Sequence, residues 1–145
     1  DKIQRVVICS GKVYYDLYEA RLAGKIDNVA VIRMEQYYPF PATDLLKELK
    51  AYKNAEVVWC QEEPENMGAW TFVDRKIEAV LEKVGIKAKR PAYVGRKTAA
   101  SPAAAPDNMD ESCNRRLART RAGRRAVRVQ YNEEEAEGSE RKRTE

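Results

Sequence analysis

Arg5-Val6-Val7-Ile8-Cys9-Ser10-Gly11 sets the fold class of this chain, because a continuous β-branched run ends there at a glycine turn. A short run of this kind is typical of a parallel strand that is covered on both faces. From Lys12 onward apolar residues recur at helical spacing, and Gly24 ends the predicted helix. Ser10 is placed to cap the free amides of this helix. The expected apolar stripe comprises Val13, Tyr14, Leu17, Tyr18 and Leu22.

The same unit of strand and helix recurs along the chain. Strands are predicted over 28–34, 55–60 and 91–95, one helix begins near Pro41, and another follows the acidic stretch after Cys60. Residues 86–89 are interpreted as a short extended piece. This alternation predicts an α/β fold, in which a three-layer, mostly parallel sheet carries helices on both faces. The buried stripes expected in these two helices are Leu45, Leu46 and Leu49, and Phe72, Val73, Ile77, Val80, Leu81 and Val84.

Length and composition favour one domain followed by a separate tail. The 145 residues suffice for one core, because a body of this size buries roughly two thirds of its unfolded surface. Residues 1–106 carry the strand and helix pattern, whereas 107–145 form a charged, low-complexity tail that we expect to be disordered or irregular. Arginines cluster in this tail and glutamates follow them. This composition motivates the hypothesis of a shifted reading frame, which resequencing would refute by finding one uninterrupted frame.

Charge and residue usage exclude several classes of function. The formal net charge is only +4, and neither body nor tail carries the basic excess of a nucleic-acid binder. No apolar run approaches the ~20 residues that cross a bilayer, so we expect no membrane partner and a cytoplasmic or mitochondrial matrix location. The chain has no histidine, which weighs against an independent catalyst. Cys9 and Cys60 each end an apolar run and are interpreted as small buried hydrophobes.

Function in parallel α/β sheets gathers at the carboxyl ends of the strands. Three predicted loops qualify, namely 10–12, 35–37 and the stretch after Cys60. The first could present amides and an ammonium to a phosphate, but a capped tight turn is favoured because the upstream glycine of a phosphate-binding loop is missing. The aromatic residues of 37–41 are suited to pack on a neighbouring domain. Stacking on a nucleotide base is less favoured, because basic residues do not flank them.

The acidic stretch 62–65 has three interpretations. Its carboxylates suggest acid-base chemistry or a metal site, although consecutive side chains usually point in different directions. A subunit contact is preferred, because Pro64 restricts the backbone, Gly68 permits close approach and Trp70 offers a large anchor. The remaining alternative is a capped loop with Trp70 packed into the core of its own domain.

Four ordered segments resemble successive signatures of the 2-oxoglutarate dehydrogenase first component. The resemblance covers roughly residues 5–103 in order, which makes it far more specific than any single motif. The segments are Val7-Ile8-Cys9-Ser10-Gly11-Lys12-Val13-Tyr14-Tyr15-Asp16-Leu17; Val31-Ile32-Arg33-Met34-Glu35-Gln36 with Tyr38-Pro39-Phe40-Pro41; Trp59-Cys60-Gln61-Glu62-Glu63-Pro64 with Asn66 and Gly68-Ala69-Trp70; and Tyr93-Val94-Gly95-Arg96 followed by Ala100-Ser101-Pro102-Ala103.

The resemblance implies a transketolase-type carboxy-terminal domain, the third domain of a longer polypeptide. In that family thiamine diphosphate and magnesium are held by the two preceding domains across a homodimer interface. The full enzyme of the tricarboxylic acid cycle decarboxylates 2-oxoglutarate and passes the succinyl group to a lipoyl arm. The resemblance therefore assigns no catalytic, cofactor-binding or metal-binding residue to this chain, which we expect to be inactive alone. The implied partners are the preceding domains, a second copy, and the succinyltransferase and lipoamide dehydrogenase components of the complex.

The resemblance also implies that this domain packs against the rest of its subunit and helps the dimer to form. Some members bind AMP or acetyl-CoA near the position that matches Gln36. Basic residues can follow the second proline in such members, whereas Ala42-Thr43-Asp44 stand here. The alternative function is a stand-alone regulatory module that binds a nucleotide or acetyl-CoA at the strand ends. The implied interface residues are Glu62, Glu63, Pro64, Asn66, Gly68 and Trp70.

Overall fold

The computed structural model describes residues 2–101 of the chain. The expected tail over 107–145, its shifted reading frame and the domain boundary after residue 106 lie outside these residues. Within 2–101, no helix has the length and apolar character that crossing a membrane requires. The elements in chain order are β1 (Arg5–Cys9), α1 (Val13–Ala23), β2 (Val29–Arg33), α2 (Ala42–Leu49), the 3-10 helix η1 (Lys50–Tyr52), β3 (Glu56–Pro64), α3 (Trp70–Val84) and β4 (Ala92–Arg96).

The described strands form one parallel sheet in the order β2-β1-β3-β4. In the register of the sheet, Val7 of β1 lies between Val31 of β2 and Val58 of β3. Parallel neighbours need crossover connections, and α1, α2 and α3 supply the three that the chain order requires. The α/β class predicted from the sequence is confirmed.

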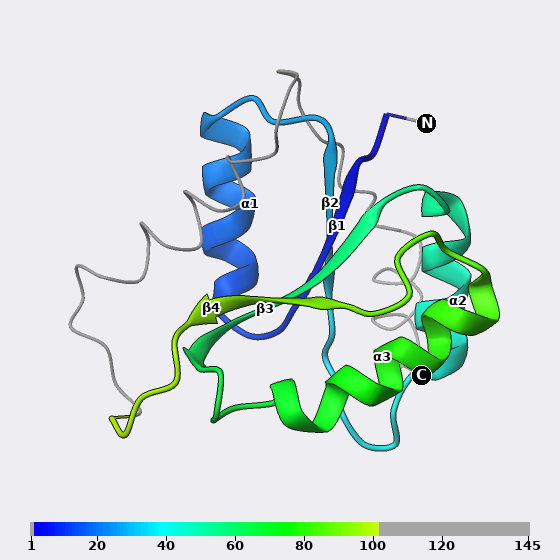
Figure 1. The fold of residues 1–145 in the computed structure, drawn as a ribbon. Coiled ribbons are helices and arrows are strands. Elements are labelled where there is room, and N and C mark those ends of the chain that lie inside the picture. The colour runs from blue at the N-terminus through cyan, green and yellow to red at the C-terminus, as the bar shows by residue number, and fades with distance from the viewer. Residues whose placement is uncertain (1, 102–145) are drawn as a thin grey trace, which may run out of the picture.

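Helices cover both faces of this sheet, as Figure 1 shows, with α1 on one face and α2 and α3 on the other. Successive side chains of a strand point to opposite faces. Val7 and Cys9 therefore pack with α1, whereas Val6 and Ile8 pack with α2 and α3. Cys60, like Cys9, is fully buried with a free thiol. The three-layer arrangement and the buried cysteines agree with the expectation from the sequence.

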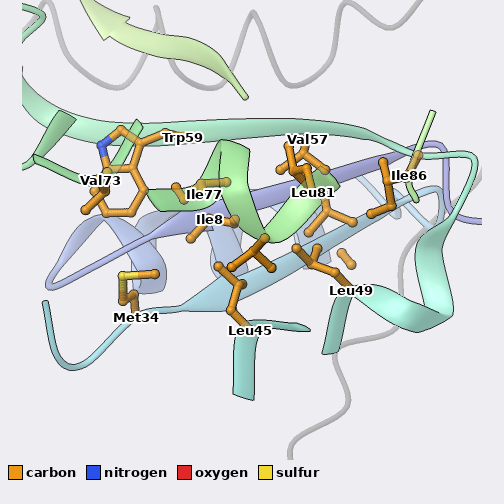
Figure 2. Close-up of a cluster of buried hydrophobic side chains, with 14 residues drawn as sticks. Ile8, Met34, Leu45, Leu49, Val57, Trp59, Val73, Ile77, Leu81 and Ile86 are labelled. Atoms are coloured by element: carbon orange, nitrogen blue, oxygen red, sulfur yellow. The ribbon is translucent and has the colours of Figure 1, made fainter. Parts of the chain in front are cut away.

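The larger core lies between the sheet and the pair α2 and α3 (Figure 2). Ile77 and Leu81 of α3 face the strands, and Leu45 and Leu49 of α2 enter the same cluster. Trp59 of β3 is fully buried in it. Complete burial of one aliphatic side chain, such as Ile77 or Leu81, contributes about 1.5–3 kcal/mol to folding. This cluster therefore holds α2 and α3 against the sheet.

Two helical residues that were expected to be buried are exposed. Leu22 is 57% exposed, because α1 buries Val13, Leu17 and Arg21 at intervals of one turn and Leu22 falls outside that row. Phe72 is 42% exposed. The Lys76 ammonium group lies over its ring, 4.7 Å from the ring centroid. Both expectations were wrong, since apolar character alone does not define which face of a helix meets the sheet.

Three local expectations also need correction. Ser10 does not cap α1, because its hydroxyl is hydrogen-bonded to the Tyr37 hydroxyl and the helix has no side-chain cap. Residues 86–89 form no strand, and Ile86 is buried in the core directly after the left-handed Gly85. The third strand continues beyond residue 60 and ends at Pro64. The acidic stretch therefore begins inside a strand rather than in a free loop.

Candidate functional site

The carboxyl ends of the described strands share one edge of the sheet, because the strands are parallel. The three candidate loops therefore meet at this edge. The hydroxyls of Ser10 and Tyr37 join the first loop to the second. The Tyr37 ring lies 6.1 Å, between centroids, from the ring of Trp59 in β3. The structure thus brings the regions selected from the sequence into one neighbourhood.

The loop between β2 and α2 uses its polar side chain internally. The Gln36 side-chain amide is exposed and donates a hydrogen bond to the Pro39 carbonyl oxygen at 2.9 Å. Tyr38 is joined to Pro39 by a cis peptide bond and is 83% exposed. This loop therefore presents an aromatic ring outward and holds Gln36 against its own backbone.

Buried and exposed side chains do not alternate regularly in the acidic stretch, because the pairing of β3 with β4 shifts its register between Cys60 and Pro64. Gln61 and Pro64 are buried, Glu63 and Glu65 are exposed, and Glu62 is partly buried. Within residues 2–101, no group of three or more His, Cys, Asp or Glu side chains is positioned to hold a metal ion. The carboxylates of this stretch therefore do not form the convergent site that metal binding needs.

The pairing of β3 with β4 is irregular at this point. Cys60 pairs with Val94 and Pro64 pairs with Arg96, so three residues of β3 bulge opposite the single residue Gly95. A Cβ atom at Gly95 would lie 2.9 Å from the Gln61 carbonyl oxygen. Gly95 thus permits the bulge, which turns the acidic residues away from the regular sheet.

A single buried side chain, Gln61, organises the segment that follows. Its Oε1 accepts hydrogen bonds from the indole N–H of Trp59 at 2.9 Å and from the backbone N–H of Trp70 at 3.0 Å. Its Nε2 faces the carbonyl oxygens of Met67 at 2.7 Å, Pro64 at 3.1 Å and Glu63 at 3.4 Å. One amide therefore satisfies polar groups in the strand, in the loop 65–69 and at the start of α3.

Two more side chains fasten this loop to β4 and to the residues after it. The Asn66 amide donates to the Ala99 carbonyl oxygen and accepts from the Ala99 backbone N–H, both at 3.1 Å. The Tyr93 hydroxyl lies 2.9 Å from the Glu63 carbonyl oxygen and 3.0 Å from that of Arg96. Asn66 was expected at a subunit interface, and its amide is engaged within this chain.

Gly68 and Trp70 complete the loop at the start of α3. Gly68 has φ of +66°, and a Cβ atom there would lie 2.9 Å from the Gln61 Nε2 atom. The left-handed conformation and the short distance both favour glycine. Trp70 is partly buried, and its ring lies 5.4 Å from the Tyr93 ring. One side of Trp70 thus packs on its own domain, while part of the ring stays accessible.

Two basic residues at this edge are engaged by neighbours of the same chain. Lys12 forms an ion pair with Asp16 at 2.6 Å. Arg33 is paired with Glu35, and its guanidinium group lies 5.1 Å from the ring centroid of Tyr15. Lys12 and Arg33 are therefore already committed to partners, unlike the convergent, uncommitted cations that a phosphate site uses.

The buried end of α1 carries an unusual charge. Arg21 is only 6% exposed, and its Nε and Nη1 atoms find no hydrogen-bond partner among residues 2–101. Desolvation by burial lowers the pKa of this guanidinium, against a smaller opposing effect of Tyr18. Arg21 lies near the carboxyl end of α1, away from the candidate site, and we assign it no part in that site.

The six interface residues expected from the sequence all lie in β3, in the following loop or at the start of α3. Pro64 is buried, whereas Glu63 is exposed. Their role as contact residues stays a prediction. Sequence reasoning missed Gln61 and Tyr93 as organisers of the loop. The available signal for Gln61 was its position two residues after Trp59, which places both on the core face of one strand.

Comparison with known proteins identifies the family that carries this loop. Residues 1–121 match the family described as 2-oxoglutarate dehydrogenase C-terminal. The chain belongs to this family. Relatives named 2-oxoglutarate dehydrogenase E1 component from Brucella anthropi, Brucella ovis and Brucella canis are each 59% identical to it over 102 residues. That alignment covers 70% of this chain and 10% of each relative, so the chain spans about a tenth of the proteins it matches. The resemblance drawn from the four ordered segments is confirmed.

Membership of the 2-oxoglutarate dehydrogenase C-terminal family raises the question of thiamine diphosphate and magnesium. The described residues do not fit either group, because no carboxylate or thiol cluster suited to a metal forms among 2–101. Lys12 and Arg33 at the candidate edge are each paired with an acid of the same chain.

Proposed function

We propose that this chain is the carboxy-terminal domain of a 2-oxoglutarate dehydrogenase first component and that it serves subunit packing and dimerisation. The family match and the 59% identity to E1 components support this proposal. The complete enzyme would decarboxylate 2-oxoglutarate and transfer the succinyl group to lipoamide. Thiamine diphosphate and magnesium would be held by the domains that precede this segment. The chain alone would then contribute a surface and not a reaction.

The observation that carries the contact role is the way residues 62–69, at the end of β3 and in the loop after it, display their carboxylates. Glu63 and Glu65 are exposed, and neither forms an ion pair within residues 2–101. The backbone beside them is fixed by the bonds of Gln61 and Asn66. An exposed charged pair on a fixed backbone is suited to a complementary basic surface, because little conformational freedom is lost on docking.

An aromatic component lies next to these carboxylates. Trp70 and Phe72 both belong to the first turn of α3, which directly follows the loop. Trp70 is partly buried and Phe72 is 42% exposed. Aromatic residues beside a polar rim are the composition that protein interfaces favour. The loop and the start of α3 together form the proposed contact surface, defined as residues 62–72.

Binding to a truncated relative tests this proposal. The partner is the Brucella anthropi E1 component shortened before the segment that this chain matches, and binding is measured by copurification and by calorimetry. The wild-type chain is expected to bind and to restore dimer formation. The double variant Glu63→Lys/Glu65→Lys is expected to weaken binding by about tenfold or more, because both charges would then oppose the partner.

A matched variant separates this effect from a general change of charge. Glu19→Lys/Glu82→Lys makes the same change at two exposed positions of α1 and α3 outside residues 62–72. It is expected to bind like the wild type. Failure of the wild-type chain to bind, or equal weakening by both double variants, would overturn the proposed contact surface.

A further inference from the structure

Gln61 stands out because its entire hydrogen-bonding capacity is used inside the domain. Its side chain is 5% exposed, and its oxygen accepts from two donors, Trp59 and Trp70. Its nitrogen faces three carbonyl oxygens, of which Met67 is nearest at 2.7 Å. A buried amide that is satisfied in this way is costly to replace, because any apolar substitute leaves several polar groups without partners.

These bonds join the core to the proposed contact surface. Trp59 is fully buried and fixes the amide from the side of the core. The three carbonyls belong to the strand end and to the loop, so the backbone from Glu63 to Met67 curves around one nitrogen atom. The N–H of Trp70 fixes where α3 begins. The position of each end of the loop is therefore set by the same side chain.

The packing of the backbone against the Gln61 amide leaves no room for a side chain at residue 68. A Cβ atom at Gly68 would meet the Gln61 nitrogen at 2.9 Å and the Glu63 carboxyl group at 3.0 Å. The backbone of residue 68 thus lies directly over the amide, in a conformation with φ of +66° that favours glycine. Loop and amide fit each other as one unit.

We propose that Gln61 is the positioning residue of the contact surface and holds residues 62–69 in the docking conformation before any partner binds. This inference rests on the proposed function. Gln61 itself touches no partner, since it is buried beneath the loop. Its contribution is to lower the conformational cost of association for the exposed Glu63 and Glu65.

The experiment compares Gln61→Met with a core variant, Ile77→Val, which lies in α3 and takes part in none of the hydrogen bonds of Gln61. Gln61→Met keeps the volume of the side chain and removes both its acceptor and its donors. Hydrogen exchange is measured for the amides of 62–70 and of β1, and binding is measured with the truncated relative.

The expected result is faster exchange of the loop amides in Gln61→Met, with β1 still protected, and binding weakened by about tenfold or more. Ile77→Val should leave both the loop exchange and the binding as in the wild type. Unchanged loop exchange in Gln61→Met, or faster exchange with unchanged binding, would overturn the inference. Should Gln61→Met not fold, Gly68→Ala perturbs the same network from outside the core and carries the same expectations.

The two proposals fail in different ways. If the wild-type chain does not bind the truncated relative, the contact role falls, and the exchange of the loop amides alone decides whether Gln61 organises the loop. If the wild type binds and Gln61→Met binds equally well, the contact role stands and the positioning role falls.

Discussion

Single side chains replace backbone pairing at the point where β3 leaves the sheet. Asn66 pairs with the N–H and C=O groups of Ala99 as a neighbouring strand would. The Tyr93 hydroxyl reaches the Glu63 carbonyl oxygen, and the Gln61 amide nitrogen faces that same oxygen and those of Pro64 and Met67. Buried or partly buried backbone groups need such partners, because leaving them unsatisfied costs about 1–3 kcal/mol each. The loop is therefore held by side chains that the strand pattern alone does not reveal.

Tyr52 carries a pH prediction at the same scale. Burial raises the pKa of its phenol above the usual 10.0, and the neighbouring Glu48 carboxylate adds to this effect. The folded state thus holds the proton more tightly than the unfolded state does. Its contribution to stability is complete below the unfolded pKa and is lost as the pH rises through the folded pKa. We expect the free energy of unfolding to fall above about pH 10.

Urea unfolding at pH 8 and at pH 10.5 measures this loss. In Tyr52→Phe the ionisable group is absent, so the fall between the two pH values is expected to be smaller than in the wild type. An equal fall in both proteins would show that Tyr52 does not contribute to the alkaline instability. Comparison of the two proteins at each pH removes the effect of other groups that titrate in this range.

At the scale of the element, α3 tests which helical face is energetically important. Ile77 is fully buried against the sheet, whereas Phe72 is 42% exposed on the same helix. Ile77→Ala is expected to lower the free energy of unfolding by about 2–5 kcal/mol, because it leaves a cavity in the larger core. Phe72→Ala should change it by less than about 0.5 kcal/mol, as substitutions outside the core usually do. Chemical denaturation measures both, and a larger loss for Phe72→Ala would contradict the burial pattern.

The strands and helices are largely predictable from the sequence, and the reasons are physical. The runs in β1, β2 and the first half of β3 are apolar at consecutive positions, because both faces of each strand are covered. The end of β3 is not predictable in this way. Gln61 and Pro64 are residue types that are common in loops, yet both are buried here. The burial of Gln61 is possible because its amide is hydrogen-bonded within the domain. The sequence locates the candidate surface and leaves its internal organisation to the structure.

At the scale of the whole molecule, the parallel sheet collects the candidate loops at one edge, and no metal-binding cluster forms among residues 2–101. The shared direction of the parallel strands places 10–12, 34–41 and 61–70 there together. Ion pairs within the chain engage Lys12 and Arg33 at this edge. Exposed carboxylates and aromatic rings remain for contact with another surface. This division is consistent with a domain that packs against a larger enzyme.

The nucleotide alternative can be tested on the chain alone. A regulatory module would bind AMP or acetyl-CoA near Gln36, yet the Gln36 amide donates to the Pro39 carbonyl oxygen and the nearby Arg33 is paired with Glu35. Phosphate groups need several convergent donors, whereas Gln36 and Arg33 are already engaged within the chain. We therefore expect neither ligand to raise the melting temperature at millimolar concentration. A bound ligand at one hundred times its dissociation constant would add about 2.7 kcal/mol of stability, so a clear shift would favour the regulatory module over the contact domain.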